Sequence, residues 1–137
     1  MVTILMPVYN EGASIRQTLS QVEQVLGEAD IPHSYLLVDD GSTDDTWQQL
    51  LLARQELPGL RLVRLSRNFG KEAALCAGLE RAGGDAVIVM DADLQHPPHY
   101  LPRMVELWQQ GYEIVDGVKA HRGREPFFRR WGAALYY

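Results

Sequence analysis

Residues 87–93, Val-Ile-Val-Met-Asp-Ala-Asp, decide the fold that we predict for this chain. The four apolar residues are typical of a strand that is buried on both faces, as the strands of parallel sheets are. Two carboxylates, Asp91 and Asp93, follow this strand directly. Ligands of open α/β sheets bind beyond the carboxyl ends of the strands, so we expect both carboxylates at a ligand-binding edge.

A divalent cation is the expected partner of Asp91 and Asp93, because two neighbouring carboxylates repel each other unless a cation lies between them. Oxygen ligands without His or Cys favour Mg²⁺ or Mn²⁺ over Zn²⁺. Gln95 follows two residues later and can add a neutral carbonyl oxygen from the same turn.

The rest of the chain alternates between strand and helix patterns, which predicts a parallel sheet with helical crossovers. The predicted strands cover residues 3–6, 35–38, 60–65, 87–90 and 113–118. The predicted helices cover residues 15–26, 47–54, 72–81, 98–110 and 126–137. Within residues 60–65, apolar residues alternate with Arg, which indicates a strand with one more exposed face near a sheet edge. We therefore predict one α/β domain over residues 1–137, with an open, mainly parallel sheet and helices on both of its faces.

Local signals support several of these boundaries. Ser14 and Gln17 have the spacing of a capping box at a helix start, and Gly27 is a stop signal near the end of that helix. Pro7 is expected to end the first strand. The Ala-rich helix that contains Cys76 has small residues that allow close packing on the sheet, and we interpret Cys76 as a packing residue.

Composition limits the function classes. With 137 residues, of which 46% are hydrophobic, the chain can form one globular core. A single cysteine excludes an internal disulfide and a Cys-based zinc site, and no apolar run reaches the length of a membrane span. Residues 119–130 contain five Lys or Arg and one Glu, whereas the remainder has eight Lys or Arg and seventeen Asp or Glu. This asymmetry indicates a metal on one side and an anionic partner on the other; a solvated basic helix face is the alternative.

Acidic residues follow three separate strands: Glu11, then Asp39 and Asp40, then the pair described above. Such an edge suits a nucleotide whose diphosphate is held through a divalent cation. Asp39 can accept a hydrogen bond from a base or ribose, and Tyr9 can flank a base ring. The alternatives are that these acids only cap helices and that Tyr9 is a half-buried core residue.

No glycine-rich phosphate loop of the P-loop or dinucleotide-binding type occurs in the sequence. Phosphate binding is therefore expected to depend on the metal and on Arg or Lys side chains. This argues against a P-loop NTPase and against a dinucleotide-dependent dehydrogenase.

Four motifs in order resemble the family 2 glycosyltransferases of GT-A (Rossmann-like) fold. They are Pro7-Val8-Tyr9-Asn10-Glu11, Val38-Asp39-Asp40-Gly41-Ser42-Thr43-Asp44, Arg67-Asn68-Phe69-Gly70-Lys71-Glu72 and Asp91-Ala92-Asp93-Leu94-Gln95-His96-Pro97-Pro98. Among these enzymes, the chain is most similar to the polyprenyl-phosphate glycosyltransferases, such as dolichyl-phosphate mannosyltransferases and bactoprenol glucosyltransferases. The match covers essentially the whole chain.

The resemblance implies roles for individual residues. A nucleoside would be contacted by Pro7, Tyr9, Glu11 and Asp39, with Asp40 close by. The donor diphosphate would be bound through Mg²⁺ or Mn²⁺ held by Asp91, Asp93 and Gln95, and Lys71 would contact the donor. The lipid phosphate would face Arg122 and Arg124, since the forked donors of Arg pair well with phosphate. The catalytic residues would then be Asp91, Asp93, Arg122 and Arg124.

The implied reaction is inverting transfer of a sugar from a UDP- or GDP-linked donor to a polyprenyl phosphate at the cytoplasmic side of a membrane, with no nucleic-acid partner. Members of the family extend well beyond this length, so we expect residues 1–137 to be the N-terminal part of a longer catalytic domain.

Two alternatives remain open, and a third is disfavoured. The chain can be a nucleotide-sugar-binding fragment without turnover, or it can belong to a family 2 enzyme with a saccharide acceptor. A phosphatase of the haloacid dehalogenase type is disfavoured, because its Asp-x-Asp pair follows the first strand, whereas here the pair follows the fourth.

Overall fold

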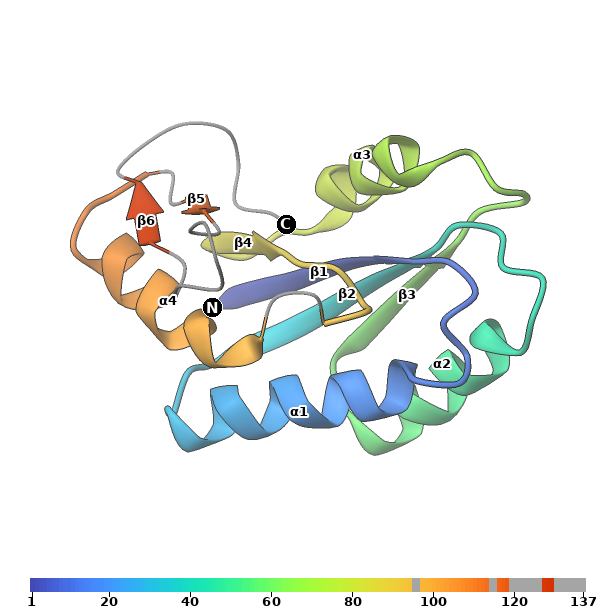
Figure 1. The fold of residues 1–137 in the computed structure, drawn as a ribbon, viewed down its shortest axis with the longest axis horizontal. Coiled ribbons are helices and arrows are strands. Elements are labelled where there is room, and N and C mark those ends of the chain that lie inside the picture. The colour runs from blue at the N-terminus through green and yellow to red at the C-terminus, as the bar shows by residue number, and fades with distance from the viewer. Residues whose placement is uncertain (95–96, 114–115, 119–126, 130–137) are drawn as a thin grey trace.

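The computed structural model of the chain describes residues 1–94, 97–113, 116–118 and 127–129. Strands and helices alternate along most of this length, as Figure 1 shows. The elements are β1 (Val2–Val8), α1 (Ile15–Glu28), β2 (His33–Asp39), α2 (Thr46–Glu56), β3 (Leu60–Arg64), α3 (Lys71–Arg81), β4 (Ala86–Val89), the 3₁₀ helix η1 (Pro98–Tyr100), α4 (Leu101–Gln109), β5 (Asp116–Val118) and β6 (Phe127–Arg129).

Four of the strands form one sheet in the order β3-β2-β1-β4, and all three pairings are parallel. The register pairs Val8 of β1 with Asp39 of β2, so these two strands end at the same level. This arrangement confirms the predicted parallel α/β sheet, and β3 lies at an edge as expected. The other edge of this sheet is β4, whose first two residues are only partly buried. The expectation that this strand is buried on both faces therefore holds only for its second half.

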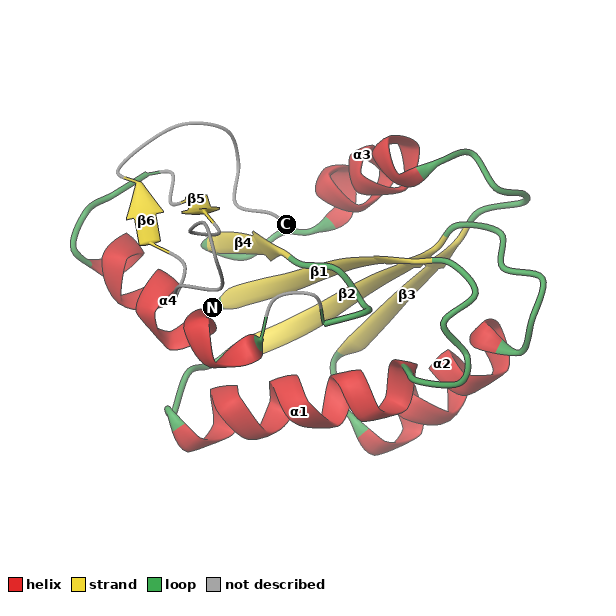
Figure 2. Cartoon of the chain, viewed as in Figure 1, coloured by secondary structure: helices red, strands yellow, loops and turns green. Residues whose placement is uncertain are grey.

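Helices cover both faces of the sheet, as Figure 2 shows and as predicted. Even-numbered residues of β1 pack with α1, α2 and α4 in the larger core, whereas Leu5 faces α3 in a smaller one. A Cβ atom added to Gly78 of α3 would lie 2.4 Å from Leu5 Cδ1, so the small residues of α3 do allow close packing on the sheet. Cys76, in contrast, is exposed on α3, and the interpretation of it as a packing residue is wrong.

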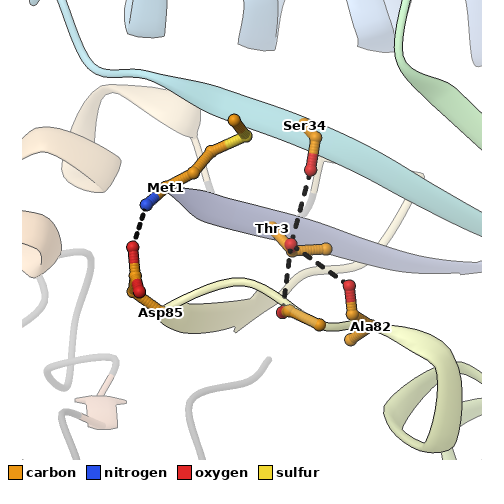
Figure 3. A network of polar contacts seen from close by, with 6 residues as sticks. Met1, Thr3, Ser34, Ala82 and Asp85 are labelled. Atoms are coloured by element: carbon orange, nitrogen blue, oxygen red, sulfur yellow. Dashed lines mark hydrogen bonds and ion pairs between the residues drawn. The ribbon is translucent and has the colours of Figure 1, made fainter.

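A polar network joins the starts of the strands, at the end of the sheet opposite their carboxyl ends (Figure 3). The Thr3 hydroxyl lies 3.4 Å from Ser34 Oγ and within 3.5 Å of the carbonyl oxygens of Ala82 and Gly83. Thr3 is buried, and these partners satisfy its hydroxyl group. The α-amino group of Met1 forms an exposed ion pair with Asp85 in the same region.

β1 extends past Pro7, where the sequence predicts its end. Leu5 O accepts a hydrogen bond from Met90 N, and Val8 O accepts one from Asp40 N. The backbone N–H and C=O groups of odd-numbered β1 residues therefore point toward β4. The pairing of β4 with β1 ends opposite Leu5. The N–H group that proline lacks would lie beyond the last paired residue of β4, so Pro7 costs the sheet no ladder hydrogen bond.

The predicted start of α1 is correct, but its predicted capping box is not formed. Ser14 is the N-cap residue, yet its side chain makes no capping hydrogen bond and donates instead to Glu11 Oε2 at 3.2 Å. The helix also includes Gly27 and ends one residue later. The Ser14 hydroxyl group acts as a donor in this contact and accepts no helix N–H, and the Ser14 ψ of −13° lies outside the extended region that is typical of an N-cap residue.

The strand predicted over residues 113–118 is confirmed as β5, but its predicted place in the parallel sheet is wrong, and so is the predicted helix 126–137 at residues 127–129. Residues 126 and 130–137 of that predicted helix lie outside the described residues. β5 does not extend the parallel sheet but pairs antiparallel with β6 in a separate two-stranded sheet, and β6 occupies part of the helix predicted from residue 126. Aromatic residues such as Phe127 and Phe128 favour strands. The eight residues between β5 and β6 are too few for the helical crossover that parallel pairing requires.

Candidate functional site

An open cleft of about 400 Å³ lies at the carboxyl ends of β1 and β4. Acidic residues that follow three different strands meet there, because parallel strands end at the same edge of the sheet. The lining residues are Pro7, Val8, Tyr9, Glu11, Asp40, Asn68, Gly70, Lys71, Asp91, Ala92 and Asp93. The structure therefore brings together seven of the residues singled out from the sequence, and Tyr9 is 43% exposed rather than part of the core.

Asp39 is the exception among the described candidates, because it does not line the cleft and has no exposed area. Its Oδ1 accepts a hydrogen bond from the backbone N–H of Ser42 at 3.0 Å. Its Oδ2 has no hydrogen-bond partner among the described residues. A buried carboxylate oxygen without a donor is costly. This oxygen is therefore a candidate acceptor for a donor that a ligand supplies.

Asp40 has a structural task that the sequence did not indicate. It is buried, and its two carboxylate oxygens accept hydrogen bonds from the backbone N–H groups of Phe69 at 2.8 Å and Gly70 at 3.1 Å. Gly70 is the N-cap residue of α3 and has a φ of 103°, which favours glycine. Asp40 thus fixes the loop that leads into α3, at whose first position Lys71 lies.

The same loop packs closely against the turn after β2. Gly41 has a φ of 68°, and a Cβ atom added to it would lie 2.2 Å from the carbonyl carbon of Arg67. Only glycine can occupy this position without strain and overlap. The approach of these two loops positions Asn68, which lines the cleft and which the sequence analysis did not single out.

The loop after β1 is joined to the loop after β2 through Asn10, another residue that the sequence analysis did not single out. Asn10 has a φ of 51°, and its Oδ1 accepts hydrogen bonds from the N–H groups of Thr43 at 2.8 Å and Asp44 at 3.3 Å. The Thr46 hydroxyl group and the Gly12 N–H both donate to Asp44, and the hydroxyl contact is the main reason why the pKa of Asp44 lies below its usual value. The polar character of the quoted motifs indicated that these loops are functional, but it does not specify which residues contact one another.

Lys71 forms an ion pair with Asp91 inside the cleft, with Nζ 2.6 Å from Oδ1. The Lys71 side chain is 49% exposed and that of Asp91 18%. Asp93 is more exposed and lines the same cleft. The described part of the cleft therefore places an ammonium group against one of two neighbouring carboxylates.

Asp91 and Asp93 are the described residues that could hold a divalent cation. No group of three or more His, Cys, Asp or Glu side chains in the described ranges is arranged as a metal site. Two carboxylates still fit Mg²⁺ chemistry, because this ion is bound through one or two carboxylates together with substrate phosphates and water. Gln95, Arg122 and Arg124, which carry the remaining metal and acceptor predictions, lie outside the described residues.

Comparison with known protein families identifies one match that covers nearly the whole chain. The model described as glycosyl transferase family 2 matches residues 3–136.

Curated proteins give consistent matches. Over 136 residues, the chain is 42% identical to an undecaprenyl-phosphate 4-deoxy-4-formamido-L-arabinose transferase from Pseudomonas syringae pv. syringae. Over 135 residues, it is 38% identical to the uncharacterized glycosyltransferase YkcC of Bacillus subtilis. Both matches cover 98% of this chain but only 40% and 42% of the two relatives, so the chain spans about two fifths of their length.

Solved structures give the same fold. A mannosyltransferase from Pyrobaculum calidifontis, PcManGT, in complex with GDP-Man and Mn²⁺, superposes with a TM-score of 0.74 at 28% identity over 88% of this chain and 35% of that chain. S. aureus TarS residues 1–349 in complex with UDP superposes with a TM-score of 0.67 at 25% identity, over 90% of this chain and 37% of that chain. These likenesses confirm the GT-A fold that the motifs imply.

Proposed function

The chain belongs to glycosyl transferase family 2, and we propose that it forms the donor-binding part of an enzyme that transfers a sugar from a nucleotide diphosphate sugar to a polyprenyl phosphate. The chain spans about two fifths of the length of these relatives, which supports placing the complete reaction in a longer protein. One relative is named for an undecaprenyl-phosphate acceptor, and the solved neighbours hold GDP-Man or UDP.

The observation that carries the proposal is the meeting of Asp91 and Asp93 with Tyr9 and Glu11 in one open cleft. In our proposal, the nucleoside lies along Pro7, Tyr9 and Glu11, where the exposed ring of Tyr9 flanks the base.

Asp39 contributes to the same subsite when the donor binds. Because Asp39 has no exposed area, the residues that cover it move on binding, and a base or ribose donor group then satisfies its unpartnered Oδ2. Asp40 acts indirectly, because both of its carboxylate oxygens are occupied by backbone N–H groups of the loop that positions Lys71.

Asp91 and Asp93, together with Gln95, would hold a divalent cation, either Mg²⁺ or Mn²⁺, that binds the donor diphosphate. When bound, such a cation neutralises the charge that develops on the leaving diphosphate. Lys71 lies on the same side of the cleft and adds a second positive charge near the phosphates.

Transfer then proceeds with inversion. A phosphate oxygen of the lipid attacks the anomeric carbon from the face opposite the nucleotide, a new carbon–oxygen bond forms, and the bond to the nucleoside diphosphate breaks. A phosphate monoester has a second pKa of about 6 and is largely ionised near neutrality. The acceptor therefore needs orientation rather than a strong general base, and we assign this orientation to Arg122 and Arg124.

We propose that this reaction takes place at a membrane, since the acceptor is a lipid, and at its cytoplasmic side, as the family resemblance implies. None of the helices in the described ranges has both the length and the apolar character of a membrane-spanning segment.

Isothermal titration calorimetry tests the donor site directly. The chain is titrated with UDP-glucose and with GDP-mannose, each with and without Mn²⁺. We expect one donor to bind in a metal-dependent manner. Asp93→Ala should abolish the metal-dependent part while the circular dichroism spectrum stays unchanged, because Asp93 is exposed.

Asp85→Ala is the matched control, because this acid lies at the opposite end of the sheet and its side chain is 70% exposed. It should bind the donor as the unmodified chain does. Unchanged donor affinity in Asp93→Ala would contradict the metal assignment, and failure of both donors to bind would contradict the proposed function.

A further inference from the structure

The ion pair between Lys71 and Asp91 occupies the place where the proposed cation site needs a free carboxylate. Lys71 Nζ lies 2.6 Å from Asp91 Oδ1, which is a direct charge-assisted hydrogen bond. The pair therefore neutralises one of the two carboxylates when no ligand is bound.

The position of Lys71 is fixed by the fold. Lys71 is the first residue of α3, and the two residues before it donate their backbone N–H groups to the buried carboxylate of Asp40. Gly70 sets the direction of the chain with a φ of 103°. A helix start that is tied down in this way limits the range of the Lys71 side chain, although this side chain remains about half exposed and can change partners.

We propose that Lys71 is an internal stand-in for the divalent cation, which holds Asp91 in the donor-free protein and transfers to the donor diphosphate when a metal–nucleotide complex enters the cleft. This inference rests on the proposed function and specifies how the site is regulated. No covalent step is involved: the ammonium group exchanges one anionic partner, a carboxylate, for another, a phosphate oxygen.

Simple electrostatics explains why this exchange is useful. A free divalent cation that approaches the donor-free cleft finds Asp91 already paired with an ammonium group, which it must displace to use this carboxylate. A cation that arrives with a diphosphate compensates this displacement, because the diphosphate supplies a new partner for Lys71. Lys71 therefore makes cation binding and donor binding favour each other, which is a positive coupling between the two ligands.

The test measures binding of free Mn²⁺ in the absence of any nucleotide, by electron paramagnetic resonance of the unbound ion. Lys71→Met removes the charge and keeps most of the apolar stem. An exposed ion pair contributes up to about 1 kcal/mol, so we expect Lys71→Met to bind free Mn²⁺ about fivefold more tightly than the unmodified chain. We also expect it to bind UDP or GDP in the presence of Mn²⁺ several-fold more weakly.

Two variants control for trivial effects. Lys71→Arg keeps a cation at the same position and should retain the weak affinity for free Mn²⁺. Arg54→Met removes one positive charge from the exposed surface of α2, away from the cleft, and should leave both affinities unchanged. Circular dichroism checks that each variant is folded, which we expect because both side chains are exposed.

The outcomes separate this inference from the proposed function. If the unmodified chain binds a nucleotide with Mn²⁺ but Lys71→Met binds free Mn²⁺ no more tightly than the unmodified chain, then Lys71 is not a stand-in and only this inference fails. If Arg54→Met tightens Mn²⁺ binding as much as Lys71→Met does, the effect is general surface charge and the inference also fails. If the unmodified chain binds no nucleotide with any metal, the proposed function itself fails.

Discussion

The buried oxygen of Asp39 leads to a prediction in which stability and binding change in opposite directions. Asp39 has no exposed area, and its Oδ2 has no partner among the described residues, whereas Oδ1 accepts the Ser42 N–H. In Asp39→Asn, an amide oxygen can keep the Ser42 contact, and a neutral NH₂ group replaces the unpartnered anionic oxygen. A buried unsatisfied group costs less when it is neutral. We therefore expect the free energy of unfolding to rise by about 1 kcal/mol.

The same change should weaken nucleotide binding. A hydrogen bond to a charged group contributes about 1.5–3 kcal/mol, so its loss corresponds to a Kd that is about tenfold to a hundredfold higher. Urea denaturation followed by circular dichroism gives the stability, and calorimetry with the donor and Mn²⁺ gives the affinity.

Asp85→Asn is the control for both measurements, because this exposed acid should change stability by less than about 0.5 kcal/mol. The reasoning is refuted if Asp39→Asn unfolds at clearly lower urea concentration than the unmodified chain, since Oδ2 would then have a partner in the folded protein. It is also refuted if the variant binds the donor with unchanged affinity.

Three further predictions concern the loops and helix packing around the sheet. Asp40→Asn should lower the free energy of unfolding by about 2 kcal/mol, because the variant replaces one accepting carboxylate oxygen by an NH₂ donor that faces a backbone N–H donor. Urea denaturation measures this loss. Gly41→Ala should lower it by about 3 kcal/mol, because φ is 68° and the new Cβ would overlap Arg67, which a thermal melt would show. Burial raises the pKa of Glu23, but hydrogen bonds from Tyr35 and His33 outweigh this and hold the pKa below its usual value. The stabilisation that Glu23 contributes to the folded state is therefore present above pH about 4.5 and lost as the pH falls further. Glu23→Gln should cost at most about 1 kcal/mol at neutral pH, since the carboxylate is partly exposed, and the difference from the unmodified chain should shrink in melts below pH about 4.

Each of these predictions has a matched comparison. Asp45→Asn changes an exposed acid near the same loops and should alter stability by less than about 0.5 kcal/mol. Gly59→Ala has a positive φ of 90° but open space around the new Cβ, so it should cost less than Gly41→Ala. Tyr35→Phe should reduce the pH-dependence seen with Glu23, because its hydroxyl group donates to that carboxylate. Equal losses in the two glycine variants, or a pH-independent effect at Glu23, would contradict the respective explanations.

Much of the fold was predictable because the parallel sheet repeats one simple pattern. Apolar runs such as Tyr35–Val38 are buried in the sheet, and the helical stretches between the strands are long enough for crossovers. The meeting of acidic residues at one edge follows from the same topology, since parallel strands end together. The antiparallel pairing of β5 with β6 was not predictable in this way, because strand-like residues do not specify which strand they pair with.

The sequence by itself therefore determined the parallel α/β architecture, the edge at which the acidic residues gather and, through four motifs, the family. Only the tertiary structure decided what each acid does: Asp40 binds two backbone N–H groups, Asp91 pairs with Lys71, and Asp39 keeps one buried oxygen without a partner. The physical reason is that the topology follows from the periodic pattern of apolar residues, which can be recognised within short stretches of sequence. The partner of a carboxylate depends instead on donors that loops from distant parts of the chain bring within hydrogen-bonding distance.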